Sequence, residues 1–261
     1  MLTKLVTYYL FSFLKPVYLL CICGVFVLNV FLVNSSYGDL IPNGYVNKIV
    51  FMFYMPLNLQ FDLLRWLLIL FPILLILSSF ILREVNERPT YIILRMKSYS
   101  RWFHSMFIST FVIIVFSIVI GFGVTGITIL LFPSEIVASG NIGLSLFQNT
   151  NGWLLVLNQL TLFIFTLLLL LILHTIFSFL VNNTGFALLL IIISMISSAT
   201  IGYLFPSLLK WLPLTYCLLA FREMKEISFG WSNSMILLCI VLSYGLLFLL
   251  FTNLKEKIVG V

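Results

Sequence analysis

The chain has 261 residues, of which 62% are hydrophobic and only 8% are charged, and its formal net charge is +6. A soluble domain of this size could not cover its surface with so few polar groups, so the composition excludes an ordinary soluble enzyme or binding module. The positive charge does not indicate a nucleic-acid partner, because basic residues gathered on one side of a membrane give the same excess.

Residues 1–16 are too short and too polar to cross a bilayer. Their apolar side chains follow helical spacing, at Leu2, Leu5, Val6, Tyr9 and Phe13. This pattern predicts an amphipathic interfacial helix that lies on the membrane surface and turns into the first span at Pro16. A disordered tail remains the alternative.

Six apolar runs fill most of the remaining chain. The hydrocarbon core is about 30 Å thick, which a helix crosses with roughly 20 residues. Backbone groups must be satisfied within the segment there, so we expect helices. Residues 17–261 are therefore predicted to form an all-α, polytopic permease domain with six transmembrane helices. The predicted spans are Val17–Val33, Leu63–Leu82, Phe103–Phe132, Trp153–Val181, Gly185–Phe205 and Met235–Phe251.

The charged residues of the connections give the orientation. The side that holds both termini carries nine basic and three acidic side chains, whereas the other side carries five of each. The positive-inside rule then places both termini in the cytoplasm. Abundant Phe, Leu and Ile with little Ala is typical of an AT-rich bacterial genome, so a multi-pass location in a bacterial cell membrane is expected.

Two connections on the outer side have distinct compositions. Residues 34–62 contain turn formers and an apolar patch at residues 51–55, and Asp62 is expected to pair with Arg65 one helical turn away. Residues 206–234 are too apolar for a free loop and too interrupted by prolines for a span. We expect a re-entrant helical hairpin that dips into the outer leaflet, with Trp211, Pro213 and Tyr216 as its marker residues.

The cytoplasmic loop of residues 83–101 is the most highly charged connection. Pro89 suits the first position of a short helix, and the residues after it are apolar and aromatic between basic flanks. Such a segment requires either the membrane surface or a pocket on a partner protein.

Motifs for several enzyme classes are absent from the sequence. It has no phosphate-binding G-x-x-x-x-G-K-[ST] and no cluster of cysteines and histidines for a metal. His174 lies within an apolar span and is interpreted as a buried neutral histidine bonded to a neighbouring helix, although an ionisable residue there is also a functional candidate. Glu84 and Glu87 are not adjacent, so they lack the paired-glutamate motif of membrane-embedded proteases. The chain is not expected to be an enzyme.

The loop of residues 83–101 resembles one found in type 2 ATP-binding-cassette exporter permeases. In that family an acidic stretch leaves span two, a short coupling helix follows, and a serine-arginine pair leads into span three. Glu84 and Glu87 match the acidic stretch and Ser100-Arg101 matches the pair, whereas Pro89-Thr90 stands where the family usually has Gly-Thr. The number of spans, the amphipathic N-terminal helix and the proline-containing hairpin extend the resemblance over the whole chain.

This resemblance implies an exporter assembled from two permease chains, as a homodimer or heterodimer, and two separate ATPase subunits. No cofactor is implied in this chain, because ATP and Mg²⁺ would be bound by the ATPase. The residues implied to dock on it are Glu84, Glu87, Arg88, Tyr91, Ile92, Leu94, Arg95, Met96 and Arg101.

The implied cargo is an amphipathic peptide or a lipid-like molecule. Small permeases of this family commonly serve the export of antimicrobial peptides or bacteriocin immunity. The spans carry almost no charge, which favours such a cargo over an ion. A stand-alone membrane immunity protein that binds a toxin or its receptor without ATP is the alternative.

Overall fold

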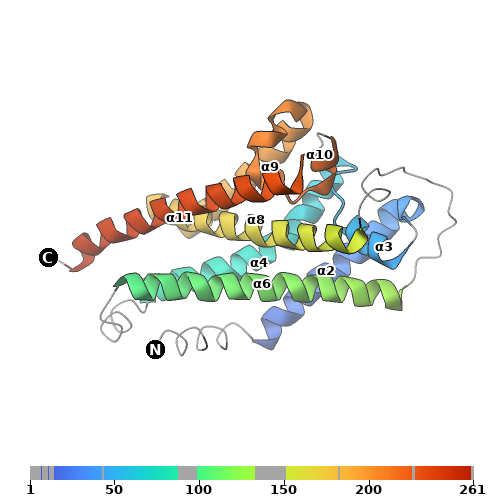
Figure 1. Cartoon of the computed structure of the whole chain (residues 1–261). Helices are drawn as coiled ribbons and strands as arrows, with labels where there is room; N and C mark the ends of the chain where they lie inside the picture. The colour runs from blue at the N-terminus through green and yellow to red at the C-terminus, as the bar shows by residue number, and fades with distance from the viewer. Residues whose placement is uncertain are drawn as a thin grey trace. The chain divides into compact units, whose positions relative to one another are not determined.

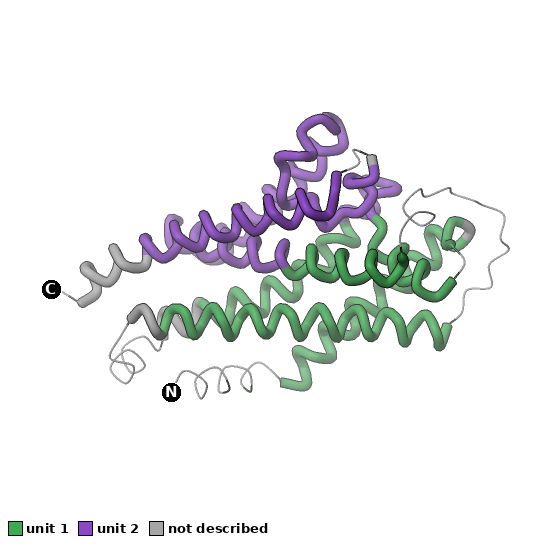
Figure 2. Tube along the Cα trace, in the orientation of Figure 1, with its two compact units in different colours: residues 1–54, 64–164 green, residues 55–63, 165–261 purple. Residues whose placement is uncertain are grey.

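The computed structural model describes residues 7, 11, 15–42, 44–87, 99–132, 151–181, 183–224 and 227–259, with the backbone alone for residues 39, 82–87, 99–101, 224 and 251–259. Every regular element within these ranges is a helix. The chain divides into two compact units, residues 1–54 with 64–164 and residues 55–63 with 165–261 (Figure 2). The predicted all-α class is confirmed for the described part of the chain.

Within the described residues, six helices are long and apolar enough to cross a membrane (Figure 1). The prediction of six spans is therefore confirmed, and the chain is a multi-pass transmembrane protein. These helices are α2 (Pro16–Tyr37), α4 (Leu59–Glu87), α6 (Tyr99–Leu131), α8 (Gly152–Val181), α9 (Thr184–Leu204) and α11 (Phe229–Val259).

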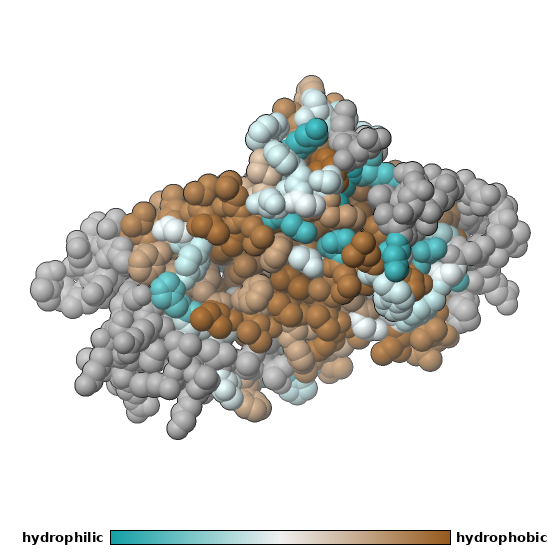
Figure 3. Space-filling view, viewed as in Figure 1, coloured by the Kyte–Doolittle hydropathy of each residue, from teal (hydrophilic) through white to brown (hydrophobic). Residues whose placement is uncertain are grey.

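The surface of the spanning helices is itself apolar. On α11, Val241 and Leu242 are 68% and 65% exposed, and on α9 Ile193 is 53% exposed. Figure 3 shows hydrophobic side chains along the long helices. Because such a surface is unfavourable in water, lipid is its natural surrounding.

The core of the first unit is built around aromatic rings. Helix α2 packs on α6, and Gly121 makes the close approach possible, since a Cβ at that position would overlap the ring of Phe26. The ring of Phe53 stacks on Phe122 with centroids 4.1 Å apart and meets the edge of Phe163 at 5.5 Å. These ring contacts hold Phe53 against α6 and α8.

The connection of residues 34–62 is more ordered than the sequence interpretation indicated. It contains the one-turn helix η1 (Gly38–Leu40) and the helix α3 (Tyr45–Met52). The apolar patch is not a loop surface, because residues 51–54 are at most 6% exposed and belong to the core of the first unit. Gly44, at φ +95°, provides the left-handed backbone that starts α3, a conformation that favours glycine.

The second unit contains the end of α8 together with α9, α11 and the segment between them. Helices α8 and α9 are separated by residues 182–183. The side chain of Asn183 caps α9 by accepting a hydrogen bond from the backbone N–H of Phe186 at 3.1 Å. Gly202 lets Leu209 pack against α9, because a Cβ there would come within 2.6 Å of the leucine side chain.

The predicted amphipathic helix of residues 1–16 lies outside the described residues, apart from positions 7, 11, 15 and 16. It remains a prediction.

Candidate functional site

Only the two ends of the predicted coupling loop lie within the described residues. Helix α4 continues past its apolar part, which ends at Leu82 in the sequence, so Glu84 and Glu87 are on its last turns. Arg101 is in the first turn of α6. The other predicted docking residues, Arg88, Tyr91, Ile92, Leu94, Arg95 and Met96, lie outside the described residues. Docking on an ATPase stays a prediction.

The predicted hairpin contains three short helices, η2 (Pro206–Trp211), η3 (Pro213–Thr215) and α10 (Leu219–Met224). A proline is the first residue of each of the first two. At that position a backbone N–H has no acceptor within the helix, so the N–H that proline lacks is not needed. Residues 229–234, which the sequence interpretation included in the hairpin, form the first turns of α11. Insertion of the hairpin into a leaflet stays a prediction.

The carbonyl oxygen of Lys210 joins the aromatic residues of this segment. The Tyr216 hydroxyl donates a hydrogen bond to it at 2.6 Å, and Trp231 Nε1 donates another at 3.4 Å. The Trp211 and Trp231 rings meet edge to face with centroids 6.4 Å apart. The structure thus brings together Trp211 and Tyr216, and it adds Trp231, which the sequence analysis did not single out.

These aromatic residues differ in their surroundings. Trp211 is 66% exposed, whereas Tyr216 is 1% exposed. Tyr216 therefore packs inside the protein rather than facing lipid, and burial raises the pKa of its hydroxyl. Trp211 and Trp231 have the exposure and the polar edge that suit a membrane interface.

Arg222 on α10 is a buried cation, and two of its three side-chain nitrogens make no hydrogen bond in the described part of the chain. It is 3% exposed, and its guanidinium lies 3.7 Å above the centroid of the Phe229 ring. Nη2 donates to the carbonyl oxygen of Ile227 at 3.3 Å, while Nε and Nη1 are buried without a hydrogen-bond partner in the described part of the chain. Burial lowers the pKa of Arg222 to about 10, so the side chain remains a cation at neutral pH.

A second buried arginine, Arg65, is held by partners from two other elements. It is 1% exposed, Nε donates to Asn29 Oδ1 at 3.1 Å, and Nη2 donates to the carbonyl oxygen of Met52 at 2.7 Å. Asn29 Nδ2 donates to the same carbonyl at 3.1 Å. These three hydrogen bonds join α2, α3 and α4 within the first unit.

The ion pair predicted between Arg65 and Asp62 stays a prediction. The Asp62 carboxylate accepts hydrogen bonds from the backbone N–H groups of residues 57 and 58 at 2.6 and 3.0 Å.

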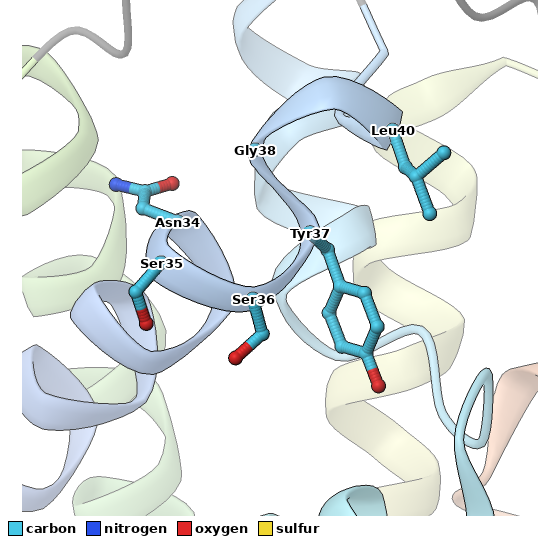
Figure 4. A pocket seen from close by; sticks show the side chains of 6 residues that line it. All are labelled: Asn34, Ser35, Ser36, Tyr37, Gly38 and Leu40. Atoms are coloured by element: carbon cyan, nitrogen blue, oxygen red, sulfur yellow. The ribbon is translucent and has the colours of Figure 1, made fainter.

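A polar cavity of about 380 Å³ lies where α2 ends. It is lined by Asn34, Ser35, Ser36, Tyr37, Gly38 and Leu40. Figure 4 shows that Asn34 and Tyr37 leave the last turn in different directions, so they do not converge on a common point. The Arg65 guanidinium lies 5.9 Å from the Tyr37 ring centroid. The described lining residues offer hydroxyl and amide groups, and none of these six side chains is a carboxylate or an imidazole.

His174 is 1% exposed within α8, which agrees with its interpretation as a buried histidine. The expected bond to a neighbouring helix is not found, because neither ring nitrogen has a hydrogen-bond partner in the described segments. Among the residues that the structure describes, no group of three or more His, Cys, Asp or Glu side chains lies close enough together to hold a metal ion. Among the described residues, the buried Asp, Arg and His side chains are Asp62, Arg65, His174 and Arg222.

The fold defines the class of protein, a helical membrane protein with six spans. No family model matches the chain, and no curated protein or solved structure matches it. The expected function was based on the sequence of the charged connection between α4 and α6.

Proposed function

We propose that the chain is the permease subunit of an ATP-binding-cassette exporter that moves an amphipathic peptide or lipid-like molecule across the membrane. Separate ATPase subunits would bind ATP and Mg²⁺, and a second permease chain would complete the path. The observation that carries the proposal is the connection between α4 and α6. Glu84 and Glu87 extend α4 beyond its apolar part and Arg101 precedes the apolar part of α6, so charged ends flank residues 88–98.

The composition of this connection supports docking better than a role in topology alone. Basic residues are sufficient to fix orientation. Tyr91, Ile92, Leu94 and Met96 have no such role, yet they are spaced over about two helical turns. An amphipathic helix on the membrane surface would also use them, so the test has to separate membrane binding from ATPase binding.

The test is reconstitution of the chain with the ATPase that co-purifies with it. We expect Tyr91→Ala combined with Leu94→Ala to abolish cargo-stimulated ATP hydrolysis and export, because truncating apolar anchors at an interface often costs about 2 kcal/mol or more each. Membrane insertion should be unchanged. Thr90→Ala with Ser98→Ala is the matched control in the same loop and should retain activity.

Two results would contradict the proposal. One is a Tyr91/Leu94 variant that inserts, recruits the ATPase and exports normally. The other is an intact chain that co-purifies with no ATPase yet protects cells from a membrane-active peptide, which would favour a stand-alone immunity protein.

A further inference from the structure

Residues 205–228 connect the ends of two spans. The apolar part of α9 ends at Leu204, and that of α11 begins at Phe229. Lipid headgroups lie at the ends of membrane spans, and tryptophan is enriched at this depth. Two tryptophans of this region, Trp211 and Trp231, are 66% and 43% exposed, so their surfaces are open to a molecule from outside the chain.

The two tryptophans form a pair whose arrangement is set by the protein. Trp211 is the last residue of η2, and Trp231 lies in the first turn of α11. Their ring planes are 83° apart, and their centroids are 6.4 Å apart. Trp231 Nε1 donates a hydrogen bond to the carbonyl oxygen of Lys210, the residue before Trp211. This bond ties the start of α11 to the end of η2 and keeps the two rings together.

The exposure of these residues would also fit ordinary anchoring at the membrane surface. An interfacial tryptophan of that kind keeps its ring in an apolar environment and turns its N–H toward water or headgroups. Trp231 departs from this arrangement, because its N–H is directed to a carbonyl of the protein. A molecule from outside therefore meets the aromatic ring of Trp231, and the face of such a ring carries partial negative charge. This favours a cation as the ligand.

Both rings can attract the same cation. The attraction between a cation and an aromatic face extends to about 6 Å from the ring centroid. The two centroids are 6.4 Å apart, so a cation beside the pair can lie within that distance of both. Nearly perpendicular aromatic rings of this kind form the walls of the cages that bind choline and methylated lysine.

A positive charge of the protein narrows the kind of cation that fits. Lys210 lies in the last turn of η2, directly before Trp211, and is exposed. Its ammonium would repel a lone cation, but it would attract a phosphate that is covalently linked to that cation. A zwitterionic phospholipid carries an ammonium and a phosphate in one headgroup, so it matches both the aromatic pair and the lysine.

We propose that Trp211 and Trp231 bind the ammonium group of a zwitterionic phospholipid in the leaflet at this end of the spans, which is the outer leaflet in the predicted topology. The lipid phosphate would pair with Lys210, and the acyl chains would continue along the apolar surface of the spans. This inference rests on the membrane-spanning fold and not on coupling to an ATPase.

The test measures binding of single phospholipids to the purified full chain by native mass spectrometry in detergent. Wild type is expected to bind phosphatidylcholine and phosphatidylethanolamine more tightly than phosphatidylglycerol, which has no ammonium. Trp211→Leu combined with Trp231→Leu should weaken binding of the two ammonium lipids about fivefold or more, because leucine keeps an apolar side chain but removes the aromatic face. Binding of phosphatidylglycerol should change by less than about twofold, because this lipid has no cation for the rings to attract.

Trp153→Leu is the matched control, because Trp153 is 56% exposed and lies at the start of another span, α8. It should change the preference for ammonium lipids by less than about twofold, since one exposed ring attracts a cation only weakly. An equal loss of preference in the control and in the double variant would mean that exposed tryptophans attract these lipids in general, and it would overturn the proposal. Equal weakening of all three lipids in the double variant would leave the pair as a membrane anchor only and would overturn it too.

Further outcomes distinguish other ligands. If soluble phosphocholine bound wild type as tightly as phosphatidylcholine, the ligand would be a soluble ammonium compound and the lipid assignment would be wrong. If Lys210→Gln tightened the binding of the ammonium lipids, Lys210 would repel the ammonium rather than hold the phosphate, and the zwitterionic headgroup would be the wrong ligand.

A variant that preserves the shape of the site covers the case in which the double leucine variant does not fold. Fluorinated tryptophan at position 231 decides then, because fluorine weakens the negative charge of the ring face and leaves the shape of the residue almost unchanged. Affinity for phosphatidylcholine should fall as fluorine atoms are added, and an affinity that stays constant refutes the site.

Discussion

Replacing Asn29 should destabilise the first unit far more than an ordinary polar substitution in a span. Asn29 is fully buried, accepts a hydrogen bond from Arg65 Nε and donates one to the Met52 carbonyl, both at 3.1 Å. Arg65 is six residues into α4, about 9 Å along the helix, so water does not easily replace the lost acceptor.

The magnitude follows from these two bonds. A hydrogen bond to a charged group contributes about 1.5–3 kcal/mol, and a neutral hydrogen bond between membrane helices averages about 0.6 kcal/mol. Asn29→Leu keeps the volume and removes both, so we expect a loss of about 2–3 kcal/mol in unfolding free energy. Asn29→Asp should lose less, because its carboxylate still accepts from Arg65.

The assay is equilibrium unfolding of the purified chain in mixed micelles titrated with SDS, followed by far-ultraviolet circular dichroism. Asn233→Ala is the matched control, since the Asn233 side-chain oxygen is buried without a partner in the described segments and its removal should change stability by less than about 0.5 kcal/mol. A double-mutant cycle of Asn29→Leu with Arg65→Met should give a coupling energy of about 1 kcal/mol or more. If Asn29→Leu lost no more than the control, the Asn29–Arg65 bond would not be stabilising and the reasoning would fail.

Three shorter predictions concern topology and the segment between α9 and α11. A single cysteine at position 92 in a cysteine-free chain should be labelled only after the membrane is permeabilised, and labelling from outside intact cells would refute cytoplasmic placement of residues 83–101. Fluorescence of a variant that keeps Trp211 as its single tryptophan should be quenched by phospholipids brominated near the headgroup, and an unquenched, water-exposed indole would refute insertion of the hairpin. Tyr216→Phe should cost about 1 kcal/mol, because it removes the bond to the Lys210 carbonyl. Burial raises the pKa of Tyr216 in the folded state, so its contribution to stability should be present at neutral pH and lost as the pH rises through that pKa. If the unfolding midpoints of wild type and Tyr216→Phe differed by the same amount at neutral and at high pH, this prediction would be contradicted.

The six spans were predictable because each is a long apolar run with few competing interpretations. Their ends were less predictable. Charged and polar residues can continue a helix beyond the hydrocarbon, as α4 does to Glu87, and hydropathy does not register that extension. For the same reason, Phe229 begins α11 although the apolar run begins only at Met235.

Helix α3 was not predicted because turn-forming residues and a short apolar stretch, which is typical of a buried segment, lie side by side in this part of the sequence. Pro42, Asn43 and Gly44 indicate a turn, and the apolar residues after them are too few for a span. Their burial depends on α6, where Gly126 leaves room for Ile49, whose Cδ1 lies 3.6 Å from where a Cβ would stand, and where Phe122 stacks on Phe53. Nothing local to residues 45–54 encodes that contact.

Arg65 and Arg222 show most clearly where inference from sequence alone ends. From the sequence, Arg65 was expected to pair with Asp62 one helical turn away, and no partner was predicted for Arg222. In the structure, Nε of Arg65 bonds to Asn29, which is 36 residues away and has no feature in the sequence that links it to position 65. Arg222 uses its own loop and an aromatic ring, and its Nε and Nη1 remain without acceptors in the described segments. Hydrogen bonds to groups on two other helices compensate the burial of Arg65, whereas at Arg222 one bond to Ile227 and the Phe229 ring do so in part. Sequence shows only that both arginines lie near the ends of apolar runs, and the structure is needed to show which groups surround each buried guanidinium.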